Sequence, residues 1–400
     1  MDAEASRAPL VTPSFVWFLI AYFCFNFGQG VFPPLLPAVM QDLGVGFAGA
    51  GLFGTAFGVA RFLVSLPGGM LVERWGAPAA LHAAGAFLLG GTLLSAVASS
   101  VPVMVLARAL VGVGSGASVL VSILYLMRGT TADRRVYRGN LYEIAVTGAT
   151  AAAGYLGGVA ASRAGWRTAF AVAAIAVAVG WVASARRVLA DVDRVVGRSG
   201  PIRKPAAGGG LRLTGPLVAT YTAVVAMAVA WSGGVSTFLP LYGGAGLGLS
   251  SEAIGRAMGL AFVVEVLFLV PAGWAAARIG RVPVFVAAVG SMLAGVLVVP
   301  LAGGFGAFTV GCTLVVLGIT AWMIPPALLA EQTEFGGRAA GVYRFVSDFA
   351  YITAPLAVGW VVDLGGFRAA AITLAAVFGA ALLAIVVAFG LAGPRRGDAS

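Results

Sequence analysis

Residues 67–76 read Pro-Gly-Gly-Met-Leu-Val-Glu-Arg-Trp-Gly, and residues 271–280 read Pro-Ala-Gly-Trp-Ala-Ala-Ala-Arg-Ile-Gly. Both segments keep Pro, Gly, Arg and Gly at the same spacing, 204 positions apart, and both close a long apolar run. The offset continues in both directions, so the chain reads as two related halves. Membrane bundles are commonly built from such repeats, and a duplicated helical bundle is therefore the leading interpretation.

Composition places the chain in lipid. Apolar residues make up 60% of its 400 residues and charged residues 10%, with a mean hydropathy of +0.99. A soluble surface needs more polar groups than this. The apolar runs are each long enough to cross the roughly 30 Å hydrocarbon core as a helix. They span residues 14–37, 48–71, 78–98, 101–127, 139–161, 166–185, 214–242, 250–276, 282–301, 304–329, 339–361 and 367–391. We expect an all-α membrane protein with twelve transmembrane helices in two pseudo-symmetric six-helix bundles.

The arginines predict the orientation, because Lys and Arg are retained in short cytoplasmic loops. One set of loops holds Arg74, Arg128, Arg134, Arg135, Arg138, the run from Arg186 to Arg212, Arg278, Arg281, Arg338, Arg395 and Arg396. The opposite loops hold Arg163, Arg167 and Arg368. We therefore predict a multi-pass protein of a prokaryotic inner (plasma) membrane with both termini in the cytoplasm. Topology explains the net charge of +10, so nucleic acid is not an expected partner.

The same reading divides the chain into domains. Residues 1–185 form an N-terminal bundle, the basic segment 186–213 is a cytoplasmic linker, and residues 214–400 form a C-terminal bundle.

The sequence gives little support for an enzyme or for an ATP-driven pump. Lys204 is the only lysine and lies outside any phosphate-binding Gly-rich loop, so no Walker motif is present. The segment Gly112-Val113-Gly114-Ser115-Gly116 lies inside an apolar run, where close helix packing explains the glycines better than a dinucleotide loop does. His82 is the only histidine, so no His-based metal cluster or Ser-His triad can form. We expect no metal, no cofactor and no enzymatic activity.

The first segment resembles the loop signature of the major facilitator superfamily, Gly-x-Leu-x-Asp-Arg-x-Gly followed by basic residues. The matching residues are Gly69, Leu71, Glu73, Arg74 and Gly76, with Glu73 in place of Asp and Ala77-Pro78 in place of the basic pair. The second copy keeps Gly273, Arg278 and Gly280 and adds Arg281, but has Ala277 at the acidic position.

Other segments extend the resemblance over nearly the whole chain. Arg108 and Gly112 are similar to the family's Arg-x-x-x-Gly stretch, and the eleventh run has Pro355 and Gly359. The resemblance implies two six-helix halves around a central cavity lined mainly by helices 1, 4, 7 and 10, a substrate site near mid-membrane, alternating access by rocking of the halves, and a monomer.

Ionisable residues inside the apolar runs are candidates for coupling and gating, because charges in lipid are costly and usually functional. Arg61 and Asp348 lie at similar depths, ~15 Å and ~13 Å from one side at 1.5 Å per residue. In the family the two helices pack together, so we predict an Arg61–Asp348 pair. The pair is either a gate that breaks and reforms or a static contact that compensates two buried charges.

Glu265 corresponds to Arg61 under the offset and is our first choice for proton coupling, since a buried carboxyl can bind and release a proton during transport; the alternative is a glutamate in a water-filled vestibule. Glu143 and Arg344 follow Tyr142 and Tyr343 and lie nearer the cytoplasmic surface. Snorkelling, or salt bridges that close the cytoplasmic face, explain these two residues as well as a proton role does.

The expected cavity is aromatic with small polar groups. Arg108 suits an anionic or carbonyl group, or holds helix 1 through a hydrogen bond with Gln29. The other candidates are Asn26, Ser115, Trp231, Ser232, Thr237, Thr320 and Trp322. This mixture favours a partly apolar organic substrate over a sugar or inorganic phosphate.

We therefore expect a secondary transporter of a small organic compound, proton-coupled, with export slightly favoured. The alternatives are a proton-linked importer of an organic anion through Arg108 and Arg61, and a non-transporting membrane sensor with the same bundle.

Overall fold

The computed structural model describes residues 11–128, 132–197, 214–332 and 337–390, without the side chains of 65–71, 73, 128, 132–136 and 337–341. The predicted linker from residue 198 onward and the termini therefore lie outside the described part. So do the side chains of Leu71, Glu73, Arg128, Arg134, Arg135 and Arg338.

Every regular element in the described residues is a helix, and they group into two compact units. The first unit takes residues 1–35 and 56–202, and the second takes 36–55 and 203–400. The helices of the first half are α2 (Pro13–Gly30), α3 (Phe32–Asp42), α4 (Phe47–Ala96), α5 (Val101–Arg128), α6 (Ala132–Ala164), α7 (Trp166–Arg187) and α8 (Leu189–Gly197).

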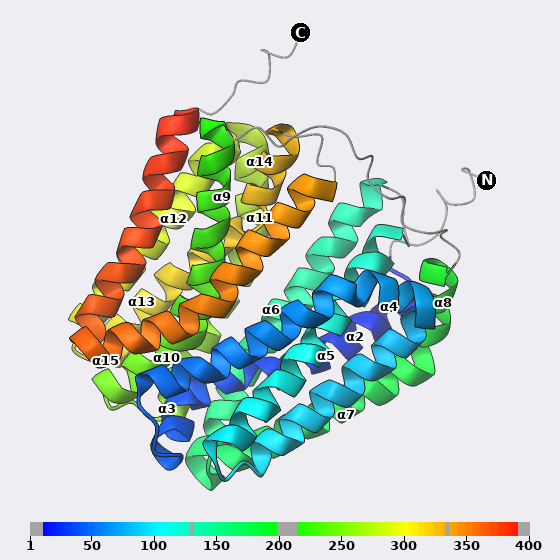
Figure 1. Ribbon diagram of the computed structural model, residues 1–400, viewed down its shortest axis with the longest axis horizontal. Coiled ribbons are helices and arrows are strands. Elements are labelled where there is room, and N and C mark those ends of the chain that lie inside the picture. The colour runs from blue at the N-terminus through cyan, green and yellow to red at the C-terminus, as the bar shows by residue number, and fades with distance from the viewer. Residues whose placement is uncertain (1–10, 129–131, 198–213, 333–336, 391–400) are drawn as a thin grey trace. The chain divides into compact units, whose positions relative to one another are not determined.

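In the second half, short segments of π- and 3₁₀-helix interrupt the α-helices. Figure 1 labels the α-helices of both halves. The elements of the second half are α9 (Gly215–Val229), η1 (Ala230–Phe238), α10 (Leu239–Leu241), η2 (Tyr242–Gly246), α11 (Ser251–Ile279), α12 (Arg281–Val298), η3 (Val299–Leu301), α13 (Phe305–Gly318), η4 (Ile319–Ala321), α14 (Ile324–Gln332) and α15 (Gly337–Phe389).

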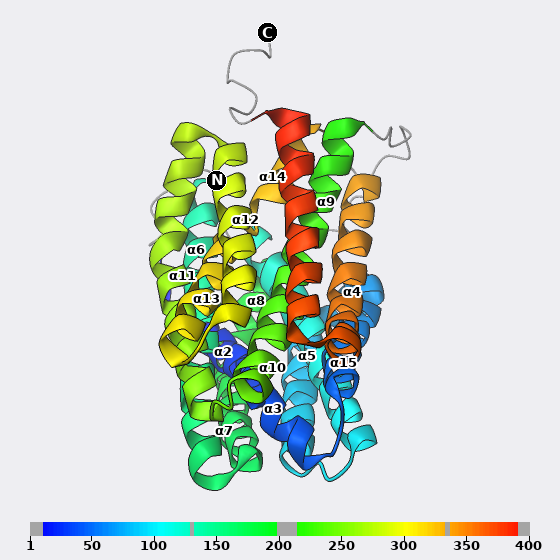
Figure 2. The ribbon, with the colours of Figure 1, turned by 90° about the vertical axis from the view of Figure 1, so that its left-hand side faces the viewer.

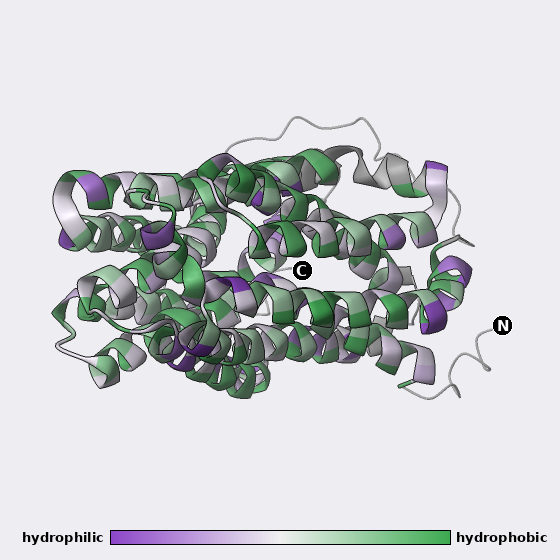
Figure 3. Cartoon of the chain, turned by 90° about the horizontal axis from the view of Figure 1, so that it is seen from below, coloured by the Kyte–Doolittle hydropathy of each residue, from purple (hydrophilic) through white to green (hydrophobic). Residues whose placement is uncertain are grey.

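The predicted all-α membrane fold is confirmed. In the described part, 11 stretches are long and apolar enough to cross a membrane. The last, Val342–Phe389, has 48 residues and breaks at Gly366, so it supplies two of the predicted crossings. Figure 3 shows hydrophobic residues along most of the length of the helices, as lipid requires.

Single glycines form the corners between consecutive helices. Gly76 (φ 81°, ψ 156°) and Gly280 (φ 99°, ψ 159°) stand at matched positions of the two signatures. Gly165 (φ 83°, ψ 159°) and Gly366 (φ 73°, ψ −179°) form another pair of corners. This combination of positive φ with extended ψ is essentially restricted to glycine. The last Gly of each signature is therefore required by backbone geometry.

Helix starts are capped by side-chain oxygens. The N–H of Phe15 donates to Thr12 Oγ1 (3.2 Å) at the start of α2, and the N–H of Ala253 donates to Ser250 Oγ (3.2 Å) at the start of α11. The start of α4 corresponds to that of α11 under the offset of 204, but Gly46 stands where Ser250 stands in the second half. Asp363 supplies the missing cap, accepting from Phe47 N–H at Oδ1 (3.1 Å) and Ala48 N–H at Oδ2 (2.8 Å).

Within the second unit, the capped start of α4 packs closely on α15 near Asp363. A Cβ added at Gly359 would lie 2.2 Å from the Phe47 carbonyl oxygen, and one at Gly51 would lie 2.3 Å from the Pro355 carbonyl oxygen. The hydroxyl of Thr55 donates to the Ile352 carbonyl oxygen at 2.8 Å. Glycines thus allow the two backbones to approach, as is common in membrane helix packing.

In the first unit, the glycines of α5 have the packing role predicted for them. A Cβ at Gly112 would lie 2.3 Å from the Phe57 carbonyl oxygen, and one at Gly114 would lie 2.7 Å from Leu88. A Cβ at Gly116 would lie 2.9 Å from the Arg61 carbonyl oxygen. Residues 112–116 therefore seat α5 against α4, and the prediction of helix packing is confirmed.

The predicted linker begins as a helix. α8 buries Val192 and Val196 and contacts α5 and α7, and the Tyr125 hydroxyl of α5 donates to Asp191 Oδ2 at 2.6 Å. Residues 189–197 are therefore docked on the first unit.

Candidate functional site

Candidate residues of the second unit gather where the membrane helices depart from α-helical geometry. The segment after α9 is the π-helix η1, which contains Trp231, Ser232 and Thr237. The segment after α13 is the 3₁₀-helix η4, which contains Thr320 and precedes Trp322. Such interruptions within a membrane helix often occur at functional sites. Gly233 and Gly234 account for part of the departure, since glycine is a poor α-helix former.

The hydroxyls in these segments bond to their own helices. Thr237 Oγ1 donates to the Ser232 carbonyl oxygen (2.8 Å), Ser232 Oγ to that of Ala228 (2.9 Å), and Thr320 Oγ1 to that of Leu317 (2.8 Å). These hydroxyls therefore stabilise the irregular backbone, which is a structural role beside the predicted one in the substrate cavity.

Glu265 is buried in the same part of the second unit. Its exposed fraction is 4%. It lies one turn after Phe262 on α11, and the Phe262 ring lies 5.8 Å from that of Trp231 between centroids. Residues three apart share a helix face. Glu265 is therefore on the face of α11 that meets η1, and α11 also contacts η4.

Asp348 and Arg344 form an ion pair along α15, with Arg344 Nε 2.5 Å from Asp348 Oδ2. Asp348 is 8% exposed as a residue, so a buried carboxylate here has a cation one helical turn away. The predicted Arg61–Asp348 contact joins the two units and stays a prediction.

In the first unit, the buried Arg108 on α5 stacks on aromatic rings. Its Cζ lies 3.9 Å from the centroid of the Phe32 ring and 5.0 Å from that of Phe57. Its exposed fraction is 6%. Cation–π contact in a dry environment stabilises a guanidinium and fixes its orientation. The predicted hydrogen bond with Gln29 stays a prediction.

The amides of α2 also bond locally. Asn26 Nδ2 donates to the Tyr22 carbonyl oxygen (2.9 Å) and Gln29 Nε2 to that of Phe25 (3.3 Å). Ser115 is buried at 2% exposed, on the same helix as Arg108, and Glu143 is half-buried on α6.

An aromatic cluster in the first unit was not foreseen as a group. The Phe18 ring lies 4.4 Å from Tyr22, 4.6 Å from Tyr125 and 6.1 Å from Tyr142 between centroids. It joins α2, α5 and α6. The Tyr22 hydroxyl donates to the Ser118 carbonyl oxygen at 2.7 Å, and Ser122 Oγ donates to the Tyr142 hydroxyl at 3.1 Å. The available signal was the presence of tyrosines in apolar runs, because a buried phenol needs a hydrogen-bond partner.

The signature arginines lie at helix ends. Arg74 is exposed, and Arg278 stacks on Trp274 with its Cζ 4.3 Å from the ring centroid. Arg281 forms an ion pair with Glu331. Among the residues that the structure describes, no group of three His, Cys, Asp or Glu side chains is placed to hold a metal.

Buried arginine and carboxylate side chains on membrane-spanning helices, together with interruptions of those helices near polar residues, are typical of membrane transport proteins. The sequence profile described as Major Facilitator Superfamily matches residues 18–347. The chain belongs to this superfamily and is a membrane transporter rather than an enzyme.

Solved transporter structures share the fold. The nucleoside transporter NupG aligns over 94% of this chain and 99% of its own, with 13% identity and a TM-score of 0.70. A POT family transporter in complex with 5-aminolevulinic acid aligns over 93% and 95%, with 13% identity and a TM-score of 0.73. Another POT family structure, in complex with a thioalcohol conjugated peptide, has 14% identity and a TM-score of 0.73 over the same shares. Among curated protein sequences, none matches the chain.

Proposed function

We propose that this chain is a proton-coupled secondary transporter of a small organic compound, with Glu265 as the coupling residue. The observation that carries the proposal is the burial of Glu265 on a membrane-spanning helix, one turn from the Phe262–Trp231 contact. Carboxyl groups placed in lipid-spanning helices are rare and commonly serve proton relays. Protonation of Glu265 would thus remove a charge near η1, the segment that contains several candidate substrate residues.

The substrate class is inferred from the side chains of η1, of the residue after η4 and of the adjoining face of α11. Trp231, Phe262 and Trp322 offer aromatic surface, while the neighbouring hydroxyls already bond to their own helices. Such a surface favours a compound with a substantial apolar part. We propose export as the direction, with binding of the proton and of the compound alternating at this part of the second unit.

Proton flux in proteoliposomes tests the proposal. Under an imposed pH gradient, pools of cationic, neutral and anionic organic compounds are added to wild type, Glu265→Gln and Glu252→Gln. Glu252 is the matched control, because it lies on the same helix at its first turn and pairs there with Arg256 at 2.9 Å. We expect compound-induced proton movement in wild type and Glu252→Gln, and only the background of empty liposomes in Glu265→Gln.

Each other outcome has a definite meaning. Undiminished proton movement in Glu265→Gln would remove this residue from the role and direct attention to Asp348 or Glu143. Flux without protons would indicate a uniporter or another coupling ion. Absence of compound-dependent flux in wild type would contradict the proposed class of substrate.

Arg108 supports a second candidate, import of an organic anion. Its guanidinium lies near the Phe32 and Phe57 rings, and a planar guanidinium suits recognition of a carboxylate. On this hypothesis Arg108→Gln abolishes uptake of anionic compounds, and Arg108→Lys, which keeps the charge but loses the planar fork, restores only part of it. Equal uptake by both variants and wild type would contradict it.

A further inference from the structure

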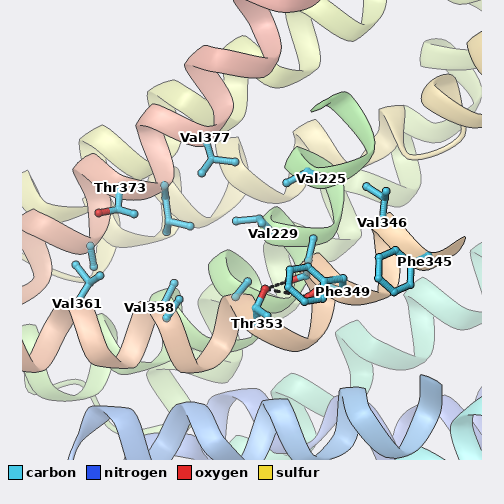
Figure 4. A pocket seen from close by; sticks show the side chains of 15 residues that line it. Val225, Val229, Phe345, Val346, Phe349, Thr353, Val358, Val361, Thr373 and Val377 are labelled. Carbon is cyan, nitrogen blue, oxygen red and sulfur yellow. Dashed lines mark hydrogen bonds between the residues drawn. The ribbon is translucent and has the colours of Figure 1, made fainter. Parts of the chain in front are cut away.

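We propose that a groove in the second unit binds one acyl chain of a bilayer phospholipid. The groove, here called the acyl slot, is a pocket of about 360 Å³ between α9 and the two arms of α15, residues 337–365 and 367–389. Its walls include Val225 and Val229 of α9, Phe349 and Val358 of the first arm, and Thr373 and Val377 of the second. Figure 4 shows these side chains converging on one space from three helices.

The shape of the acyl slot follows from the corner at Gly366. The two arms of α15 leave this residue and diverge, and α9 lies along the wedge between them (Figures 1 and 2). The lining residues of the first arm run from Phe345 to Val361, about 24 Å of helix at 1.5 Å per residue. A single leaflet contributes about 15 Å of hydrocarbon, half of the roughly 30 Å core. The slot is therefore long enough to hold a chain running parallel to the helices.

A second pocket of about 410 Å³ continues the acyl slot toward the start of α9. The two pockets share Val225 and Val346, and the second adds Val218 and Tyr221. The apolar surface therefore extends to a helix end, where a lipid headgroup would leave the hydrocarbon region.

The threonines of the lining donate their hydroxyl protons to their own helices. Thr353 Oγ1 donates to the Phe349 carbonyl oxygen and Thr373 Oγ1 to that of Ala369, each at 2.9 Å. Thr222, in the second pocket, donates to the Val218 carbonyl oxygen at 2.9 Å. A site for a polar organic compound carries a few convergent polar groups that orient it. The slot matches hydrocarbon instead.

Large side chains stand at the rim and small ones inside. Phe345 and Phe349 are 57% and 59% exposed, whereas Ala350 and Ala354 are 5% and 6% exposed. Exposed aromatic rings therefore border a groove whose floor includes buried alanines. Since a chain passing from the bilayer into the slot gains packing but no hydrophobic transfer energy, shape complementarity decides its occupancy.

Photolabelling tests the acyl slot. Wild type is reconstituted with a phospholipid that carries a diazirine in one acyl chain, irradiated, digested and mapped by mass spectrometry. The test variant is Ala357→Trp, which fills the slot from an exposed position, and the matched control is Ala294→Trp at an exposed alanine of α12. Melting temperatures verify that both variants are folded.

We expect adducts concentrated in residues 345–361 and 370–377 of wild type and Ala294→Trp, and their severalfold loss in Ala357→Trp. Adducts spread evenly over exposed helix faces, including α12, would overturn the proposal, and so would adducts that Ala357→Trp leaves unchanged. If transported compounds displaced the label, the slot would belong to the substrate path and not to lipid. The labelling does not require transport, so its outcome is independent of the role of Glu265.

Discussion

Single glycines determine where consecutive helices can turn. Gly76 and Gly280 end the two signatures with positive φ and extended ψ, and Gly165 and Gly366 do the same elsewhere. A Cβ is not tolerated in this backbone region without strain of about 1–3 kcal/mol. The sequence carries this information only as a repeated Gly, and the structure supplies the reason.

Replacement of a corner glycine by alanine is expected to destabilise the protein. Gly280→Ala and Gly76→Ala should each cost about 1–3 kcal/mol, because alanine disfavours the required dihedral angles. The controls are Gly290→Ala and Gly90→Ala, two helical glycines with nothing within 4 Å of an added Cβ. These should be neutral or stabilising by up to about 1 kcal/mol. Thermal unfolding in detergent compares the pairs, and equal melting temperatures within a pair would contradict the assignment.

For the buried ionisable residues, the sequence predicts burial better than it predicts the neighbouring side chains. Burial of Glu265, Asp348 and Arg108 could be expected from their positions in apolar runs, and all three are under 9% exposed. The neighbours of these residues were predictable only in part. Arg344 stands four residues before Asp348, so the two share a face of the predicted helix and can pair. Phe32 and Phe57 reach Arg108 from helices that sequence spacing alone does not bring together.

At the scale of elements, α4 depends on α15 for its N-terminal cap. Local sequence leaves Gly46 without a capping side chain, and Asp363 fills the role from 316 positions away. A carboxylate at a helix start also interacts favourably with the helix dipole. No local signal could have revealed this cap.

Removal of the Asp363 carboxylate should loosen the start of α4. Asp363→Ala is expected to cost about 1 kcal/mol, seen as faster hydrogen exchange of the peptide that contains Phe47 and Ala48. The double variant Asp363→Ala with Gly46→Ser should recover much of the protection, because serine restores the local cap that Ser250 provides for α11. Asp193→Ala, an exposed aspartate of α8, is the control and should leave this peptide unchanged. Failure of the serine to restore protection would show that Asp363 acts by another route.

The helices themselves were well predicted from sequence, because apolar runs in lipid have little choice but to be helical. The interruptions were not. Three interruptions are the end of α2 at Gly30 and the segments η1 and η4. They depend on Pro, Gly and hydroxyls that bond to their own helix, all within continuous apolar runs. Hydropathy identifies a crossing without reporting how its hydrogen bonds shift, so the irregular segments that carry Trp231 and Thr320 appeared only in the structure.

At the scale of the whole molecule, the basic residues predict which side of the membrane each loop faces. On a background with Cys24→Ala and Cys312→Ala, single cysteines replace Ser99, Gly303 and Arg187, all of them exposed. A membrane-impermeant thiol reagent should label Ser99→Cys and Gly303→Cys in intact cells, and Arg187→Cys only after lysis. The reverse pattern would place both termini outside.

Duplication is preserved unevenly across the chain. The corners Gly76 and Gly280 and the starts of α4 and α11 recur at matched positions, since any six-helix half needs such features. Position 61 and its counterpart 265 carry opposite charges. Features required by the fold are therefore repeated, while the candidate coupling residues differ between the halves, which is why the repeat predicted the architecture better than the site.

The glycine corners also bear on how the chain reaches this structure. A one-residue corner reverses the chain direction as soon as both helices are formed, so the contacts near the corner close almost no loop and lose little chain entropy. Four such helical hairpins, turned at Gly76, Gly165, Gly280 and Gly366, would form from contacts that are close in sequence. Assembly in the bilayer then becomes the docking of preformed hairpins, and the slow steps are left to the few long-range contacts, such as that of Asp363 with the start of α4.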